Sequence, residues 1–207
     1  MKKCIQISAF ILCLSALAWA GSTKFTSAWK NPAVGPLDPA GVRIAIFVVS
    51  QDESMRLGPE ETLATELRNR GRDAKAGYTV LPAELNRDKE KAKMFLKKAG
   101  LTHAIMIRVV SKDEEVNYVP GTVWYTQSYY PSFWGYWGHG WSTVYSPGYV
   151  YSDTVVTLET LLYSIEPDQL MWASISRTTN PKDIRKMVKD LANATAKQMR
   201  KAGLLQK

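Results

Sequence analysis

The sequence contains very little cysteine and histidine. Its 207 residues include two cysteines, Cys4 and Cys13, and two histidines, His103 and His139. Both cysteines fall within the first twenty residues, which have the features of an export signal, so the mature chain would contain no thiol. Disulfides, thiol catalysis and cysteine-ligated metals are therefore excluded for the mature protein. Its fold must depend on a hydrophobic core, for which about 187 residues are sufficient.

The first twenty residues are predicted to be a secretory signal that is cleaved after Ala20. Lys2 and Lys3 form a basic start, residues 5–17 are largely apolar, and Ala18 and Ala20 supply the small side chains that a signal peptidase requires. The apolar run is shorter than the roughly 20 residues of a membrane span, which argues against a retained anchor. We expect an exported protein, either periplasmic or associated with the outer membrane.

A lipoprotein signal is the alternative, because Cys13 follows an apolar run. Residues 10–12 are Phe, Ile and Leu, however, and lack the small residue expected ahead of a lipidated cysteine. Removal of Lys2 and Lys3 with the signal lowers the formal net charge from +8 by two, to +6. This mild basic bias is compatible with anionic lipid or cell-wall polymer nearby.

Catalytic and metal-binding motifs are also missing. The sequence has no GxSxG, no HExxH and no phosphate-cradling glycine loop. His103 begins a predicted core strand, and His139 has no acidic neighbour in sequence, so we expect no metal site and no cofactor. The basic residues are separated from the aromatic ones, which argues against nucleic-acid binding. We therefore predict a protein that is not an enzyme.

Paired carboxylates of the kind that glycosidases use are not evident either. Glu114 and Glu115 are adjacent and would point to opposite faces of a strand, as part of the acidic run that begins at Asp113. Asp153 and Glu159 would share a face but stand roughly 20 Å apart at strand spacing, which is too far for either glycosidase geometry. We interpret these acids as a solvated, charged ribbon.

The remaining chain is predicted to form one domain over residues 43–207, preceded by an extended segment over residues 21–42 with Phe25 and Trp29 as anchors. Residues 43–50, RIAIFVVS, form a nearly continuous apolar run typical of a buried strand. Apolar periodicity and turn signals place further strands at 73–81, 102–110, 152–165 and 170–178, and helices at 58–71, 88–99 and 181–203. The strand at 102–110 is expected to continue through the charged run to Tyr118. Gly100 is the predicted stop of the helix at 88–99, and Asn180 is the predicted cap of the last helix. Trp172 is a candidate core residue.

The order of these elements predicts the topology. Two crossovers from strand through helix to strand favour three parallel strands, with the strand at 43–50 in the centre. The last two strands would add as an antiparallel hairpin. We expect an α/β fold, or an α+β fold, built on a mixed five-stranded sheet with about three helices.

An uncharged aromatic stretch lies between the third and fourth predicted strands. Residues 124–151 hold twelve of the 22 aromatic residues, mixed with glycine, serine and proline, in a predicted connection over residues 122–151. Three hypotheses remain open: the stretch packs on its own sheet, presents rings to a protein or glycan partner, or enters a membrane interface. The candidate binding residues are Trp124, Tyr129, Tyr130, Phe133, Trp134, Tyr136, Trp137, His139, Trp141, Tyr145 and Tyr149.

Several segments resemble a family of exported bacterial envelope proteins, many of them lipoproteins, that is known only as a domain of unknown function. The matching segments are WKNP, RIAIFVVS, LRNRG, DEEVNYVPG, SDTVVTLETLLYSIEPDQLMW and the closing helix. The resemblance implies an envelope location and a mixed sheet with helices, and it brings no catalytic residue. From the aromatic stretch and the export signal we predict a non-catalytic envelope protein that contacts a protein or glycan, with a membrane-surface module as the alternative.

Overall fold

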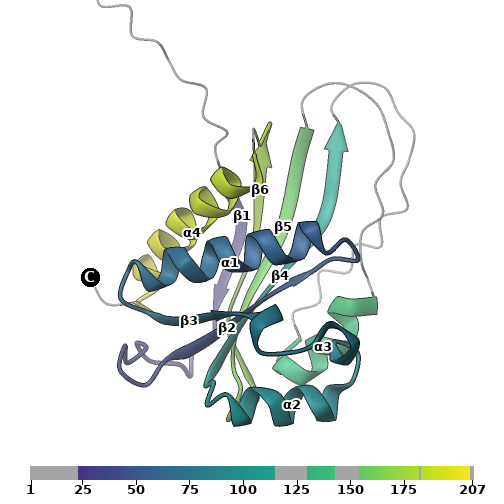
Figure 1. The fold of residues 1–207 in the computed structure, drawn as a ribbon. Coiled ribbons are helices and arrows are strands. Elements are labelled where there is room, and N and C mark those ends of the chain that lie inside the picture. The colour runs from purple at the N-terminus through teal and green to yellow at the C-terminus, as the bar shows by residue number, and fades with distance from the viewer. Residues whose placement is uncertain (1–22, 115–129, 143–153, 182, 206–207) are drawn as a thin grey trace, which may run out of the picture.

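The computed structural model describes residues 23–114, 130–142, 154–181 and 183–205 (Figure 1). These residues form a six-stranded mixed sheet in the order β1-β6-β5-β4-β2-β3, with helices packed on both faces. The strands are β1 (Thr23–Lys30), β2 (Arg43–Val49), β3 (Asp73–Ala76), β4 (His103–Glu114), β5 (Thr154–Ser164) and β6 (Gln169–Thr179). The α-helices are α1 (Ser54–Arg68), α2 (Lys89–Lys98), α3 (Phe133–Ser142) and α4 (Ile184–Lys201).

The predicted α/β class and the core topology are confirmed. Strand β2 lies between β3 and β4 and runs parallel to both. Strands β5 and β6 continue the sheet from β4 as antiparallel neighbours. The parallel part follows from the two crossovers through α1 and α2, and the antiparallel part follows from the short turn between β5 and β6.

The predicted count of five strands is wrong, because the N-terminal segment supplies a sixth. Strand β1 pairs antiparallel with β6 at the edge of the sheet. Its side chains are alternately half-buried and exposed over most of its length, without a continuous apolar run. Phe25 packs against Trp172, with 6.2 Å between ring centroids, and Trp172 is fully buried as predicted. A half-buried edge strand is hard to distinguish from an extended segment by composition alone.

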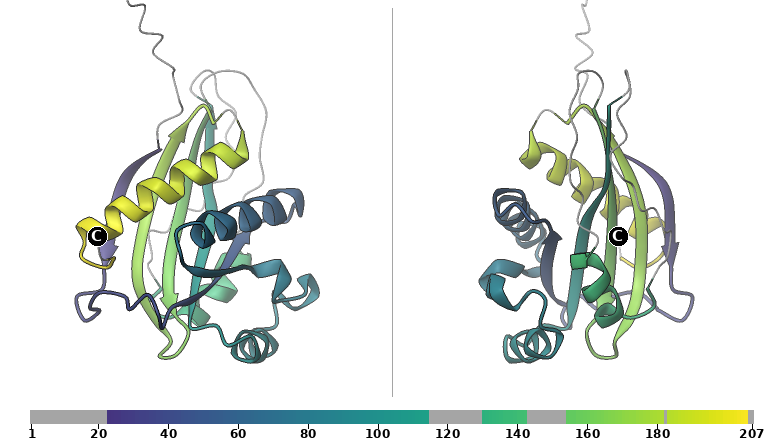
Figure 2. Two further views of the ribbon diagram at one scale, coloured as in Figure 1. Left: turned by 60° about the vertical axis from the view of Figure 1, so that its left-hand side comes forward. Right: turned by 90° about the vertical axis from the view of Figure 1, so that its right-hand side faces the viewer.

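Helices cover both faces of the sheet (Figure 2), and the residues of β2 alternate between those two faces. Ala45, Phe47 and Val49 point to the face covered by α2 and α3, where they join one cluster of buried side chains. Ile44, Ile46 and Val48 belong to a second cluster, with side chains of α1 and α4. A strand that is buried on both faces needs apolar residues at every position, which explains the run RIAIFVV.

Helix α1 begins four residues earlier than the predicted start at Gly58. Ahead of it, the carboxylate of Asp52 accepts the backbone N–H of Ser54 at 2.8 Å. Pro59 therefore lies inside the helix rather than at its first position. The carboxylate of Glu60, which is fully buried, accepts the backbone N–H groups of Val48 at 3.0 Å and Tyr78 at 2.8 Å. This side chain joins the end of the β2–β3 pair to α1.

The observed boundaries of β3, α2 and α4 can also be compared with their predictions, and local contacts explain each outcome. Strand β3 stops at Ala76 instead of residue 81, because Gly77 starts a short 3-10 turn over Gly77–Thr79. Helix α2 agrees with its prediction within a residue at each end, and Asp88 caps it by accepting the N–H of Lys91. The cap of α4 is Asp183, whereas the predicted cap Asn180 accepts the N–H of Thr154 at 2.8 Å. A second 3-10 turn covers Ala83–Leu85.

The aromatic stretch contains a helix that the sequence analysis did not predict. Helix α3 occupies Phe133–Ser142 in the middle of the expected connection. Strand β4 reaches Glu114, which confirms the predicted extension of the third strand to that point. The rest of that extension, to residue 118, lies outside the described residues. The predicted signal also lies outside them. Among the helices that the structure describes, none has the length and apolar character to cross a membrane.

Candidate functional site

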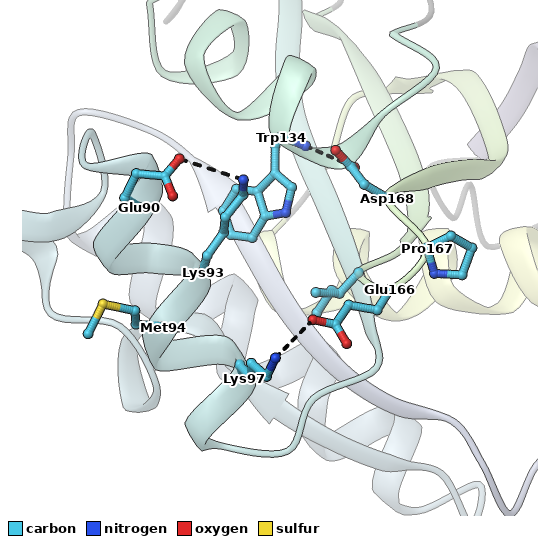
Figure 3. A pocket seen from close by; sticks show the side chains of 9 residues that line it. Glu90, Lys93, Met94, Lys97, Trp134, Glu166, Pro167 and Asp168 are labelled. Atoms are coloured by element: carbon cyan, nitrogen blue, oxygen red, sulfur yellow. Dashed lines mark hydrogen bonds and ion pairs between the residues drawn. The ribbon is translucent and has the colours of Figure 1, made fainter.

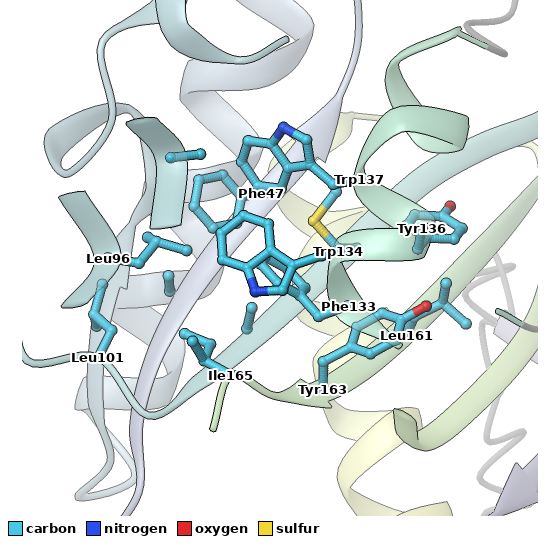
Figure 4. Close-up of a cluster of buried hydrophobic side chains, with 14 of the residues drawn as sticks. Phe47, Leu96, Leu101, Phe133, Trp134, Tyr136, Trp137, Leu161, Tyr163 and Ile165 are labelled. Atoms are coloured by element: carbon cyan, nitrogen blue, oxygen red, sulfur yellow. The ribbon is translucent and has the colours of Figure 1, made fainter. Parts of the chain in front are cut away.

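The aromatic side chains of α3 lie in the hydrophobic core (Figure 4). Phe133, Trp134, Tyr136 and Trp137 are each at most 6% exposed. Trp137 meets the ring of Phe47 edge-on, with 5.1 Å between centroids. Their spacing of one, three and four residues puts them on one face of the helix, while Gly135 and Gly138 lie on the exposed face. This part of the stretch follows the first hypothesis, in which it packs on its own sheet.

The start of α3 is held by the turn between β5 and β6. The carboxylate of Asp168 accepts the backbone N–H of Trp134 at 3.2 Å, and Ser132 Oγ accepts that of Gly135 at 2.9 Å. The N–H of Leu170 donates to the carbonyl of Pro131 at 2.7 Å. Side-chain acceptors satisfy N–H groups that a helix start leaves unpaired, and a carboxylate also suits the positive end of the helix dipole. The hairpin turn therefore orients the helix.

A buried polar cluster anchors the same helix to the sheet. Arg108 of β4 and Glu159 of β5 are direct cross-strand partners, at 6% and 4% exposure. Glu159 Oε2 accepts from Arg108 Nε at 3.2 Å and lies 3.1 Å from Arg108 Nη2. The hydroxyl of Tyr136 donates to the same carboxylate oxygen. The prediction that Glu159 belongs to a solvated ribbon is therefore wrong, because a cation and a phenol satisfy its charge inside the core.

The protonation state of Tyr136 follows from its place in this cluster. Burial raises the pKa of Tyr136 well above its usual value, and the neighbouring charge of Glu159 raises it further. Tyr136 therefore stays protonated and remains a hydrogen-bond donor near neutral pH. Through this hydrogen bond to Glu159, Tyr136 positions α3 against the sheet.

His139 lies at the edge of the cluster. Its ring is half-buried beside Tyr130, at 4.7 Å between centroids, and 6.1 Å from the ring of Tyr136. Burial lowers the pKa of His139, and the charge of Arg108 lowers it further. The other histidine, His103, is half-buried in β4, with Nδ1 2.8 Å from the hydroxyl of Thr102. Within the described ranges no three His, Cys, Asp or Glu side chains come together as a metal site would require.

An open groove of about 500 Å³ lies between α2 and the β5–β6 turn (Figure 3). Trp134 forms its floor, with the ammonium group of Lys93 5.2 Å from the ring centroid. Lys97 pairs with Glu166 across the groove at 3.6 Å, and both side chains are largely exposed. The lining residues are Glu90, Lys93, Met94, Lys97, Trp134, Ile165, Glu166, Pro167 and Asp168.

The candidate residues from the sequence thus fall into four groups. Phe133, Trp134, Tyr136 and Trp137 are buried, and of these Trp134 also reaches the groove. Tyr130 and His139 are half-buried at the edge of the polar cluster. For Trp141 only the backbone is described, as part of α3. The other candidates lie outside the described residues: Trp124, Tyr129, Tyr145 and Tyr149.

Sequence reasoning missed the polar cluster and the rim of the groove. Arg108 and Glu159 are 51 residues apart in the chain, and only the register between β4 and β5 places them opposite each other. The available signal was that each of these two apolar strands contains a charged residue in its interior. Such charges are rarely buried unless they are paired, so the two could have been predicted to meet. Lys93 and Lys97 have the pattern of a solvated helix face, and the approach of the β5–β6 turn makes them part of a groove.

Comparisons with known proteins provide distant structural similarities. No family model matches the sequence, and no curated protein matches it. A single-residue variant of the PelC dodecamer from Paraburkholderia phytofirmans has a TM-score of 0.47 at 14% identity, over 84% of this chain and 94% of that chain. Another PelC dodecamer structure has a TM-score of 0.46 at 14% identity, over 90% and 99%. Lipoprotein GNA1162 from Neisseria meningitidis has a TM-score of 0.37 at 13% identity, over 77% and 99%, and similarities at this level assign no function to this chain.

Proposed function

We propose that this chain is a non-catalytic, exported envelope protein that binds a partner protein through the groove between α2 and the β5–β6 turn. The N-terminal sequence supports export, with its basic start, apolar run and small residues at 18 and 20. The observation that carries the proposal is the groove itself, where a buried Trp134 lies beneath side chains of both charges. Helix α3 supports this groove from inside the core.

The chemistry of the rim favours a peptide segment over a glycan. Sugar binding by aromatic residues uses open ring faces, whereas the rings of α3 at positions 133, 134, 136 and 137 are buried, and Lys93 lies over Trp134. The rim instead offers two amines, three carboxylates and the flexible side chain of Met94, which is 68% exposed. Methionine adapts to different apolar side chains, and charges of both signs select a complementary pattern.

The buried polar cluster is separate from the groove and contributes no side chain to its lining. The buried carboxylate of Glu159 is engaged by Arg108 and Tyr136, and the phenol of Tyr136 stays protonated. Neither group faces the groove, whose lining residues come from α2, α3 and the β5–β6 turn. We therefore assign the groove to recognition and the polar cluster to support of the fold.

A charge swap tests the groove without removing its ion pair. In Lys97→Glu/Glu166→Lys the two side chains can still pair, and net charge is unchanged. Because this pair is exposed, the free energy of unfolding should change by less than about 0.5 kcal/mol. The swap reverses the charge pattern offered to a partner, so co-purification of a discrete protein from an envelope extract should fall by about tenfold.

The matched control is Lys186→Asp/Asp190→Lys, which swaps the 3.0 Å pair on α4. This variant should retain the partner at the level of the unmodified chain. If both swaps retain the partner, the groove is not the contact surface. If both swaps lose it to the same extent, the association is not specific to either surface.

A further inference from the structure

Helix α2 presents a second surface beside the groove, and the two share Met94 at their border. Lys91, Met94, Phe95 and Lys98 follow one another at intervals of three, one and three residues, so they form one stripe on the helix. All four side chains are exposed, while Ala92 and Leu96 on the opposite side are fully buried. The stripe therefore places two apolar side chains between two lysines on the outside of the molecule.

The apolar part of this stripe is unusual among the residues that the structure describes. Met94 is 68% exposed and Phe95 is 37% exposed. The other large hydrophobic residues with comparable exposure in the described part are Trp29, Met55 and Tyr78, and none of these is adjacent to another in sequence. Exposed apolar side chains grouped together with cations are typical of surfaces that contact a membrane.

The charges around the stripe are mainly positive. Arg87 is exposed one turn before Lys91, and extends the basic part of the surface beyond the start of the helix. Lys91 pairs with Asp88 at 3.2 Å, a contact in which both side chains remain accessible to solvent. Glu90 and Lys97 lie on the flank of α2 that lines the groove, and this flank meets the stripe at Met94.

We infer that this face of α2 binds an anionic lipid surface. Lys91 and Lys98 would contact headgroup phosphates, while Met94 and Phe95 would enter the boundary between headgroups and acyl chains. In Figures 1 and 2, α2 lies at one end of the molecule, where its outer side can approach a flat surface. The membrane contact predicted for the aromatic stretch is thus assigned to α2. This inference does not depend on the proposed partner protein.

The mode of contact favours lipid over a soluble anionic polymer. A polymer would use the cations alone, whereas a bilayer would also use Met94 and Phe95. Each lysine or arginine near an anionic surface strengthens binding roughly fivefold. Three cations without a deeply inserted segment therefore give weak and reversible attachment that weakens as ionic strength rises.

Vesicle flotation with the mature chain tests this assignment. The chain should float with vesicles that contain phosphatidylglycerol and should stay unbound with vesicles of phosphatidylcholine alone. Lys91→Glu/Lys98→Glu should weaken binding by at least roughly 25-fold, because two cations are lost and two repelling charges are added. Met94→Ser/Phe95→Ser should weaken it by roughly fivefold or more at unchanged charge.

The control variant is Lys189→Glu/Lys197→Glu, which reverses two exposed lysines on α4. It should bind vesicles like the unmodified chain. An equal loss in this variant would show a general attraction by net charge and would overturn the assignment. Absence of binding to phosphatidylglycerol vesicles would also overturn it, as would full vesicle binding by Met94→Ser/Phe95→Ser, the result expected for polymer-type contact through charge alone.

Discussion

Arg108 and Glu159 face each other directly across β4 and β5, with 3.1 Å between Arg108 Nη2 and Glu159 Oε2 in the core. Tyr136 adds a hydrogen bond to the same oxygen from α3. The pair thus connects the sheet to the helix that carries Trp134, the floor of the groove. Loss of either contact should therefore lower the stability of the domain and loosen the support of the groove.

Removal of the cation should be costly, and removal of both charges should cost less. Arg108→Met leaves the carboxylate of Glu159 buried without its cation, and we expect a loss of about 3–5 kcal/mol in the free energy of unfolding. Arg108→Met/Glu159→Met removes the uncompensated charge and should lose less than the single variant. Urea unfolding measures both, and an equal or larger loss in the double variant would contradict the buried-charge explanation.

The phenol of Tyr136 should contribute separately to stability. Tyr136→Phe removes the donor to Glu159 and leaves the ring in place, so we expect a loss of about 1–3 kcal/mol. Tyr163→Phe is the matched control, because its hydroxyl donates to the backbone carbonyl of Tyr130 at 3.2 Å rather than to a carboxylate. Its loss should be about 1 kcal/mol. A larger effect at Tyr163 than at Tyr136 would argue against the proposed anchor.

Stability should fall as the pH rises through the titration of Glu60. Burial raises the pKa of this carboxyl to about 7, against 4.5 in an unfolded chain. The folded state then binds the proton more tightly than the unfolded state, so the contribution of Glu60 to stability is fully present below pH 4.5 and is lost as the pH rises to about 7. The decrease from this group should approach about 3 kcal/mol.

Glu60→Gln provides the comparison for this pH dependence. The amide keeps an acceptor for the N–H of Val48 or Tyr78 and does not titrate. Urea unfolding at pH values between 4.5 and 7 should show a smaller pH-dependent loss for the variant than for the unmodified chain. Parallel curves for the two proteins would contradict the assignment to Glu60.

Two glycine substitutions should have opposite effects. A Cβ at Gly77 would collide with the ring of Phe47 and lie 2.6 Å from the carbonyl oxygen of Ile46. Gly77→Ala should therefore cost about 1–3 kcal/mol or more. Gly58 lies inside α1, and a methyl group there would point into open space, so Gly58→Ala should stabilise by about 0.5–1 kcal/mol. Thermal unfolding of both variants checks the difference in sign.

Much of the fold could be predicted because it depends on short-range pattern. The apolar run at 43–50 identified a strand buried on both faces, and Asp88 with Gly100 bounded α2. The two crossovers then fixed three parallel strands, since their handedness leaves few alternatives. Strand β1 was missed, because an edge strand is stabilised by pairing with β6 and carries only a weak signal of its own.

Helix α3 shows where local signals were insufficient. Gly135, Gly138 and Gly140 each disfavour a helix by about 1 kcal/mol relative to alanine, which made a loop the natural prediction. The apolar spacing of Phe133, Tyr136 and Trp137 was nevertheless helical. Burial of these rings against β2 and β5 outweighs the cost of the glycines, and that burial exists only in the folded chain.

The sequence by itself determined the composition of the core strands, the parallel and antiparallel order of β2 to β6, and the aromatic character of α3. The tertiary structure decided which way the aromatic rings face and which charges meet. Arg108 meets Glu159 through sheet register, and Lys97 meets Glu166 through the approach of a turn to a helix. Both contacts join residues more than fifty positions apart, a distance over which local propensity carries no information about contact.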